Sequence, residues 1–197
     1  MSKTDEMKKV RDEVVGLTAS PLYVYRKESG NLPVIGEGNH DANILFVGEA
    51  PGRNEAKTGR PFCGAAGKIL DELLESIGVA RESVYITNIV KDRPPENRDP
   101  SPSEIEIYGP FLDRQIEIIE PKVIAPLGRY AMGYIMEKFD LGAELEPISV
   151  AHGKLYKTGS LFGEMTISPM YHPAAAIYTR ALKDTLLEDF KILKQFR

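Results

Sequence analysis

Apolar and polar positions along the chain follow two different periods. The segment NILFVGEA at 43–50 holds four consecutive apolar residues before a glycine, which is typical of a buried strand. Residues 65–77 instead carry leucines and isoleucines three and four positions apart, the spacing of a helix face. Gly78 follows this face and is expected to end the helix. A strand followed by a helix is the first half of a βα unit.

The rest of the chain continues this alternation. Residues 18–42 are rich in glycine and proline and are expected to form an irregular arm. Ser101, Pro102 and Glu104 form a helix-start signal, with Ser101 as N-cap and Glu104 as its capping-box partner. The pattern predicts one α/β domain over 1–197, with a parallel sheet and helices on both faces. The other predicted elements are strands at 83–90 and 123–125, strands joined by turns over 145–168, and helices at 2–16, 102–119, 129–138 and 181–195.

Composition narrows the class of protein. The 197 residues include 25 Lys and Arg against 29 Asp and Glu, a net charge of −4, so total charge does not indicate a nucleic-acid binder. The single cysteine, Cys63, excludes an intramolecular disulfide and any site built from several thiolates of one chain. No apolar run has the roughly 18 residues of a membrane helix, and the charged N-terminus does not resemble a secretory signal. We therefore expect a cytoplasmic protein with no membrane partner.

Parallel sheets bind ligands at the carboxyl ends of their strands, which directs attention to three loops, 48–64, 88–102 and 169–180. The first, GEAPGRNEAKTGRPFCG, has 17 residues where about 2–6 is usual, so a functional role is favoured. It fits neither the GxxxxGK[ST] nor the GxGxxG phosphate motif. Its Phe62 is either a stacking surface for a planar ligand or a core anchor beneath the loop.

The other two loops each hold one notable polar residue. Asn88 lies near the end of an apolar strand, where its amide either caps a turn or binds the edge of a base. His172 follows a strand and lies between Pro169 and Pro173, which favours a binding or catalytic role; His40 and His152 lack such a setting. The sequence contains no HExxH, paired-histidine or CxxC spacing, so no protein-bound metal is predicted. It also lacks the GxSxG of α/β-hydrolases.

Together these loops carry a more specific signal than any one of them. The strings GEAPG…KTGRPFCGAAGKIL, TNIVKDRPPENRDPSPSEI and MYHPAAA, with PFLDRQIEIIEPKVIAPLG, resemble family 4 of the uracil-DNA glycosylase superfamily over roughly residues 17–195. The resemblance implies a three-layer α/β/α fold around a four-stranded parallel sheet. It also implies a DNA-repair hydrolase that excises uracil and leaves an abasic site.

The resemblance implies roles for individual residues. Asn88 matches the asparagine that reads uracil, Phe62 the aromatic that stacks on the base, and His172 the histidine that donates to uracil O2. Glu55 resembles a carboxylate that positions water, and Glu49, next to Ala50 in the first motif, is expected to have a supporting role. Alternatively, these carboxylates pair with surface cations of the same loop. Gly48, Ala50 and Pro51 belong to the first motif and are expected to line the base site.

The segment after His172 resembles the loop that enters the minor groove. Many family members have a leucine wedge there, whereas this chain has Ile177 and Tyr178, either of which has the size to fill the gap in the base stack. Arg180, Lys183 and Arg60 are expected to contact phosphates. The implied partner is uracil-containing DNA, double- or single-stranded, bound by a monomer in a prokaryotic cytoplasm.

The chain departs from family 4 in one respect. Family members carry four cysteines that bind a [4Fe–4S] cluster, and the corresponding positions here hold Leu17, Ser20, Asp92 and Tyr108. None is a thiolate, so the cluster and any other cofactor are expected to be absent. Tyr108 and Leu17 are expected to fill the space by packing, with hydrogen bonds from Asp92 and Ser20.

Two alternatives stay open on the sequence. One is a glycosylase for another deaminated base, such as hypoxanthine or xanthine. The other is a non-catalytic protein that binds uracil-containing DNA or free nucleobases, favoured by the missing cluster and by Ala50, where family 1 has a carboxylate. The presence of all five expected site residues, Glu49, Glu55, Phe62, Asn88 and His172, argues against the second.

Overall fold

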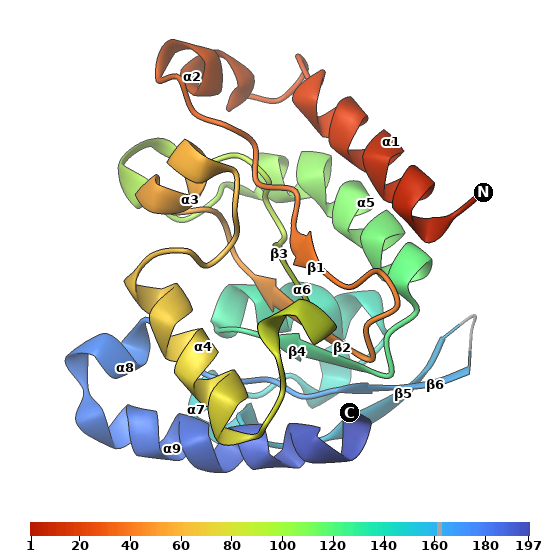
Figure 1. The fold of residues 1–197 in the computed structure, drawn as a ribbon, viewed down its shortest axis with the longest axis vertical. Helices are drawn as coiled ribbons and strands as arrows, with labels where there is room; N and C mark the ends of the chain where they lie inside the picture. The colour runs from red at the N-terminus through yellow and green to blue at the C-terminus, as the bar shows by residue number, and fades with distance from the viewer. Residues whose placement is uncertain (161–162) are drawn as a thin grey trace.

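The computed structural model, which describes residues 1–160 and 163–197, has a six-stranded sheet between two layers of helices (Figure 1). The strand order is β1-β3-β2-β4-β6-β5. The four central strands, β3, β2, β4 and β6, run parallel, which confirms the predicted parallel core. The sheet is wider than predicted because β1 and β5 add antiparallel edges. The strands are β1 (Glu37–Gly38), β2 (Ile44–Gly48), β3 (Tyr85–Asn88), β4 (Val123–Pro126), β5 (Tyr156–Ser160) and β6 (Gly163–Ile167).

Helices alternate with the strands along the chain as predicted, and several short helices occur in addition. The larger ones are α1 (Lys3–Val15), α4 (Ala65–Ser76), α5 (Pro102–Ile119), α6 (Arg129–Lys138) and α9 (Arg180–Phe190), and the short ones are α2 (Tyr23–Glu28), α3 (Arg53–Thr58), α7 (Ile148–Ala151) and α8 (Ala175–Tyr178). Single 3₁₀ segments occupy Arg81–Ser83, Pro95–Asn97, Gly142–Glu144 and Lys191–Phe196.

Three predicted segments need correction. The arm over 18–42 is not wholly irregular, since it forms α2 and the edge strand β1. The long first loop contains α3, which Gly59 ends in the left-handed conformation at φ 72°. The segment 145–168 begins with α7 before its two strands, and its residues 161 and 162 lie outside the described residues. Helices α2 and α3 have six residues each and α7 has four, which is too short for a clear helical period in the sequence.

The start of α5 was predicted correctly. The Ser101 side chain accepts from the Glu104 N–H, and the Glu104 carboxylate accepts from the Ser101 N–H, which completes the capping box. Glu120 ends the helix in the left-handed conformation at φ 55°.

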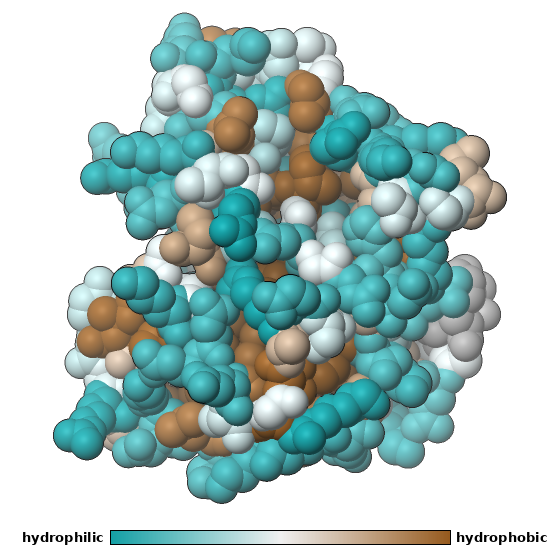
Figure 2. All heavy atoms as spheres, in the orientation of Figure 1, coloured by the Kyte–Doolittle hydropathy of each residue, from teal (hydrophilic) through white to brown (hydrophobic). Residues whose placement is uncertain are grey.

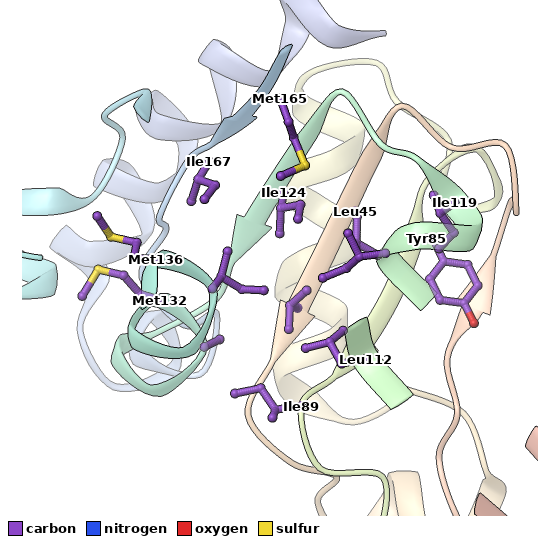
Figure 3. Packing of buried hydrophobic residues seen from close by; sticks show 14 of the residues in the cluster. Leu45, Tyr85, Ile89, Leu112, Ile119, Ile124, Met132, Met136, Met165 and Ile167 are labelled. Carbon is purple, nitrogen blue, oxygen red and sulfur yellow. The ribbon is translucent and has the colours of Figure 1, made fainter. Parts of the chain in front are cut away.

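Every residue of β2 is buried, as the apolar run predicted, because helices cover both faces of the sheet. Leu45 and Val47 pack in one core with α1, α5 and α6, whereas Ile44 and Phe46 pack in the other with α4 and α9. Figure 3 shows Leu45 and Ile124, from neighbouring strands, in the first of these cores with Leu112 of α5.

The surface is mainly hydrophilic on the face drawn in Figure 2. Among the described residues, no helix is long and apolar enough to cross a membrane. Among the described residues, the most exposed large hydrophobic residue is Tyr178, at 88%. It lies in α8, directly after the loop that carries His172.

Candidate active site

A cavity of about 430 Å³ lies at the carboxyl ends of the central strands. Parallel strands present their carboxyl ends at the same edge of the sheet, so loops distant in sequence meet there. All five expected site residues line the cavity, and the complete lining is Glu49, Ala50, Gly52, Glu55, Phe62, Ala66, Asn88, Asn97, Arg98, Asp99, His172 and Ala174.

Gly48, the last residue of β2, permits two side chains to approach the backbone. A Cβ at this position would lie 2.2 Å from Asn88 Oδ1 and 2.8 Å from Phe62 Cζ. Gly48 therefore lies behind the cavity wall, rather than lining it as predicted. Pro51 is buried and is likewise not among the lining residues, whereas Ala50 is.

Phe62 is held in an unusual backbone conformation. Its φ is +46°, a value that costs a non-glycine residue about 1–3 kcal/mol and persists only where the surroundings impose it. Gly67 of α4 approaches this residue closely, since a Cβ there would lie 1.8 Å from the Phe62 carbonyl oxygen. The ring is 6% exposed, and its centroid lies 5.6 Å from that of His172. The ring lines the cavity and also belongs to the core with α4, so its position is compatible with both interpretations of Phe62.

Asn88 ends β3 and is 2% exposed. Its neighbours in the chain continue the ladder to the first motif, where Ile89 N–H donates to Gly48 O at 2.9 Å and Val90 N–H to Glu49 O at 3.0 Å. Within the described part of the chain, its carboxamide makes no hydrogen bond, although buried amides normally have partners. The amide is thus free to bind a group that enters the cavity.

His172 is held as a neutral imidazole. Burial lowers its pKa to about 4, against a smaller opposing effect of Glu55. The Ala174 N–H donates to Nδ1 at 3.1 Å, so Nδ1 is the acceptor and Nε2 carries the proton. Gly128, after β4, lies against this residue, since a Cβ there would be 3.2 Å from His172 Cβ. Its φ of +89° also favours glycine, a requirement that the sequence analysis missed.

The two carboxylates of the first motif have different environments. Glu55 Oε1 accepts from the N–H groups of Cys63 and Gly64, both at 3.0 Å, so the ion pair with a loop cation that the sequence left open is not its contact here. Glu49 is partly buried, and burial together with the charge of Asp99 raises its pKa to about 7, while Arg129 opposes the shift. Glu49 therefore changes its charge near neutral pH.

Three consecutive residues that were not predicted as site residues also line the cavity: Asn97, Arg98 and Asp99. Arg98 forms two hydrogen bonds with Glu104, at 2.9 and 2.6 Å, so the carboxylate of the capping box also orients this loop. Asn97 has φ +57°, the left-handed conformation that asparagine tolerates. The capping signal at 101–104 does not by itself indicate this contact, because the burial of Glu104 beside Arg98 arises only in the fold.

The residues expected to contact DNA lie on α8, α9 and the first loop. Ile177 is 44% exposed beside Tyr178, and Arg180 is exposed at the start of α9. Lys183 pairs with Glu72. Arg60 is exposed, is not among the residues that line the cavity, and pairs with Glu37 through two hydrogen bonds.

The four positions that the resemblance assigns to cluster cysteines do not offer a metal site. Ser20 Oγ lies 2.8 Å from the Tyr108 hydroxyl, which donates to Asp92 Oδ2 at 2.5 Å. Arg26 donates to both oxygens of Asp92, at 3.2 and 3.0 Å, and all four side chains are buried. Leu17 packs against the neighbouring core. In the described residues, no group of three or more His, Cys, Asp and Glu is arranged to hold a metal ion. An iron–sulfur cluster does not fit these residues, because they provide no thiolate ligands.

Comparisons with known proteins agree with the resemblance. The sequence model of the uracil-DNA glycosylase superfamily matches residues 35–191. A type-4 uracil-DNA glycosylase from Archaeoglobus fulgidus is 51% identical over 80% of this chain and 78% of its own length. Type-4 uracil-DNA glycosylases from Sulfurisphaera tokodaii and Thermotoga maritima are 45% and 40% identical, over 97% and 99% of this chain and 84% and 96% of their own lengths.

Proposed function

Because the chain belongs to the uracil-DNA glycosylase superfamily, we propose that it excises uracil from DNA by hydrolysing the N-glycosidic bond. The observation that carries this proposal is the cavity in which the Asn88 amide, the Phe62 ring and the neutral His172 come together. A base inside a duplex is out of reach of such a buried cavity, so the target nucleotide must flip out of the stack.

Asn88 recognises the base in this proposal. Its NH₂ group donates to uracil O4 and its Oδ1 accepts from N3–H. Cytosine presents an amino group and an unprotonated N3 at the same places, so an amide in this orientation disfavours it. The absence of an internal partner for the amide in the described residues supports this role, as does the position of Phe62 for stacking on the base.

His172 stabilises the departing base. Negative charge develops on uracil O2 as the bond to the sugar breaks, and the Nε2–H of a neutral imidazole donates to it. The hydrogen bond from Ala174 to Nδ1 supports this tautomer, and a donor aimed at developing charge contributes a few kcal/mol, or about 10²–10³ in rate.

Glu55 and Glu49 serve the attacking water. Glu55 is fixed by two main-chain N–H groups, which supports a positioning role, and a second oxygen remains for water. Glu49 has a pKa of about 7, which suits a group that accepts a proton near neutral pH. Both carboxylates face the same cavity, where their negative charge stabilises the positive charge that develops on the sugar.

DNA is held by the segment after His172. Tyr178 and Ile177 act as the wedge that fills the gap left by the flipped nucleotide, a role that their exposure supports. Arg180 contacts phosphate directly, whereas Lys183 and Arg60 exchange their surface partners, Glu72 and Glu37, for phosphate. The exchange is inexpensive, since surface ion pairs contribute only about 0–1 kcal/mol.

The chain performs this reaction without an iron–sulfur cluster. Ser20, Asp92 and Tyr108 occupy three of the four positions that the resemblance assigns to cluster cysteines. Together with Arg26 they form a buried hydrogen-bond network that joins these segments of the chain. Iron analysis and visible absorbance of anaerobically purified protein test this statement, and a stoichiometric cluster signal would refute it. We further propose that the whole chain acts as one domain and as a monomer, in the prokaryotic cytoplasm, where its DNA substrate lies.

The deciding experiment uses a duplex with a single uracil, opposite guanine or adenine, and a single strand with the same lesion. Excision creates an abasic site, which alkali converts into a strand break. We expect strand breaks that depend on both protein and uracil. If none of the three substrates is cleaved, the proposal is wrong, and the same assay with hypoxanthine then tests a shifted base preference.

A further inference from the structure

Lys91 is a fully buried lysine three residues beyond Asn88 in the chain. Lysine is almost never fully buried unless its charge has partners, because removal of an ammonium group from water is costly. Lys91 is not among the cavity-lining residues, so it does not contact the base. We therefore expect Lys91 to have hydrogen-bond partners inside the protein and a structural role there.

Three oxygens surround the Lys91 ammonium group. Nζ donates to the main-chain oxygen of Asn88 at 2.6 Å, to Gln115 Oε1 at 2.6 Å and to Thr87 Oγ1 at 2.8 Å. An ammonium group has three N–H donors and no acceptor, so each donor has a partner. Burial lowers the pKa of Lys91 well below its usual value, and the charge of Asp113 opposes that shift.

These partners connect the end of β3 to elements on either side of it. Gln115 of α5 donates to Ile35 O at 2.9 Å, and Thr87 Oγ1 donates to the same oxygen at 2.7 Å. The main-chain oxygen of Lys91 also accepts from Val34 N–H at 2.8 Å. The Asn88 carbonyl is thus fixed to both helix α5 and the arm before β1.

The Asn88 side chain has no such anchor of its own. Within the described residues its amide makes no hydrogen bond, and Gly48 and Phe62 leave it a narrow space. The direction of the amide therefore follows from the position of its main chain. A displacement of about 1 Å at a reacting group lowers a rate by about 100-fold.

We propose that Lys91 is a positioning residue that orients Asn88 and thereby determines the choice of uracil over cytosine. This inference rests on the proposed excision of uracil. Lys91 acts through the Asn88 carbonyl and not through the base. Its loss therefore affects base recognition more than it affects the affinity for DNA.

The test is a double-mutant cycle with Lys91→Met and Asn88→Ala. Methionine keeps an unbranched apolar side chain and removes all three donors. We expect Lys91→Met to lower the single-turnover rate of uracil excision by about 10- to 100-fold and to reduce the ratio of uracil to cytosine excision. In the Asn88→Ala background the same substitution should cost little further rate, and binding to an abasic-site duplex should stay within about twofold of wild type.

Lys122→Met is the matched control, because Lys122 is exposed and precedes β4 at the opposite end of the sheet. A wild-type rate for Lys91→Met, or an equal loss with and without Asn88, would overturn the inference. If Lys91→Met does not fold, Thr87→Val removes one of the three acceptors, and its rate loss must likewise vanish in the Asn88→Ala background. Excision by the wild-type protein is measured in the same series, so failure of the proposed function is seen separately.

Discussion

The main-chain N–H of Ala174 donates a hydrogen bond to Nδ1 of His172 over 3.1 Å. This contact selects the imidazole tautomer whose proton is on Nε2, and burial lowers the pKa of His172 to about 4. The histidine therefore acts as a neutral donor and keeps this form throughout the neutral pH range. An imidazolium is not needed for the proposed stabilisation of uracil O2.

The substitution His172→Ala removes this donor. We expect the single-turnover rate of uracil excision to fall by about 10²–10³-fold. Affinity for an abasic-site duplex should be nearly unchanged, because it does not depend on contact with uracil. A rate within threefold of wild type would contradict the assigned role.

Glu49 should produce a pH dependence near neutrality. Burial and Asp99 raise its pKa from the usual 4.5 to about 7, so the excision rate should increase as the carboxylate ionises through this pH. Glu49→Gln should remove this inflection and leave a lower, flatter profile. An inflection that persists in the variant would assign it to another group.

The same shift has an effect on stability. The folded state binds the Glu49 proton more tightly than the unfolded state does. The stability contributed by the protonated group is therefore present below pH 4.5 and is lost as the pH rises to about 7. Between pH 4.5 and about pH 7, the melting temperature of wild type should therefore fall as the pH rises, and the melting temperature of Glu49→Gln should fall less.

Gly48→Ala should abolish most of the excision activity without unfolding the protein. The added Cβ would lie 2.2 Å from Asn88 Oδ1 and 2.8 Å from Phe62 Cζ, so both side chains must move. We expect at least about a 100-fold loss of excision rate, measured with the folded variant. Gly133→Ala in α6 is the control, because its Cβ meets nothing within 4 Å; it should keep the wild-type rate and gain up to about 1 kcal/mol of stability.

Asn88→Asp should relax the discrimination against cytosine. An ionised carboxylate accepts from the cytosine amino group but offers no donor to uracil O4. We expect slower uracil excision and measurable cytosine excision, assayed on duplexes that differ only in the target base. Undiminished rejection of cytosine would count against base recognition by Asn88.

Asp92→Ala should test the buried network that contains Arg26. Loss of Asp92 leaves the Arg26 guanidinium buried without its carboxylate, which costs about 3–5 kcal/mol of unfolding free energy. Glu13→Ala breaks an exposed pair with Arg114 and should cost only about 0–1 kcal/mol. Urea denaturation of both variants in one buffer measures the difference, and equal losses would mean that the network contributes little.

The local pattern predicted the elements with strong apolar periodicity. The uninterrupted apolar run of β2, the helix face of α4 and the capping box of α5 each depend on neighbouring residues alone, so the sequence specifies them. The short elements α2, α3 and α7 were missed because a single helical turn depends on contacts with the rest of the fold more than on its own pattern.

The sequence by itself determined which residue types reach the carboxyl end of the sheet, since Gly48 and Asn88 each end a strand and His172 follows one. Only the tertiary structure decided their environment. The pKa values of Glu49 and His172 and the burial of Lys91 all depend on atoms from distant segments. A pKa and a hydrogen-bond direction are determined by the surrounding field and by the available partners, and both arise only when the strands and loops pack together.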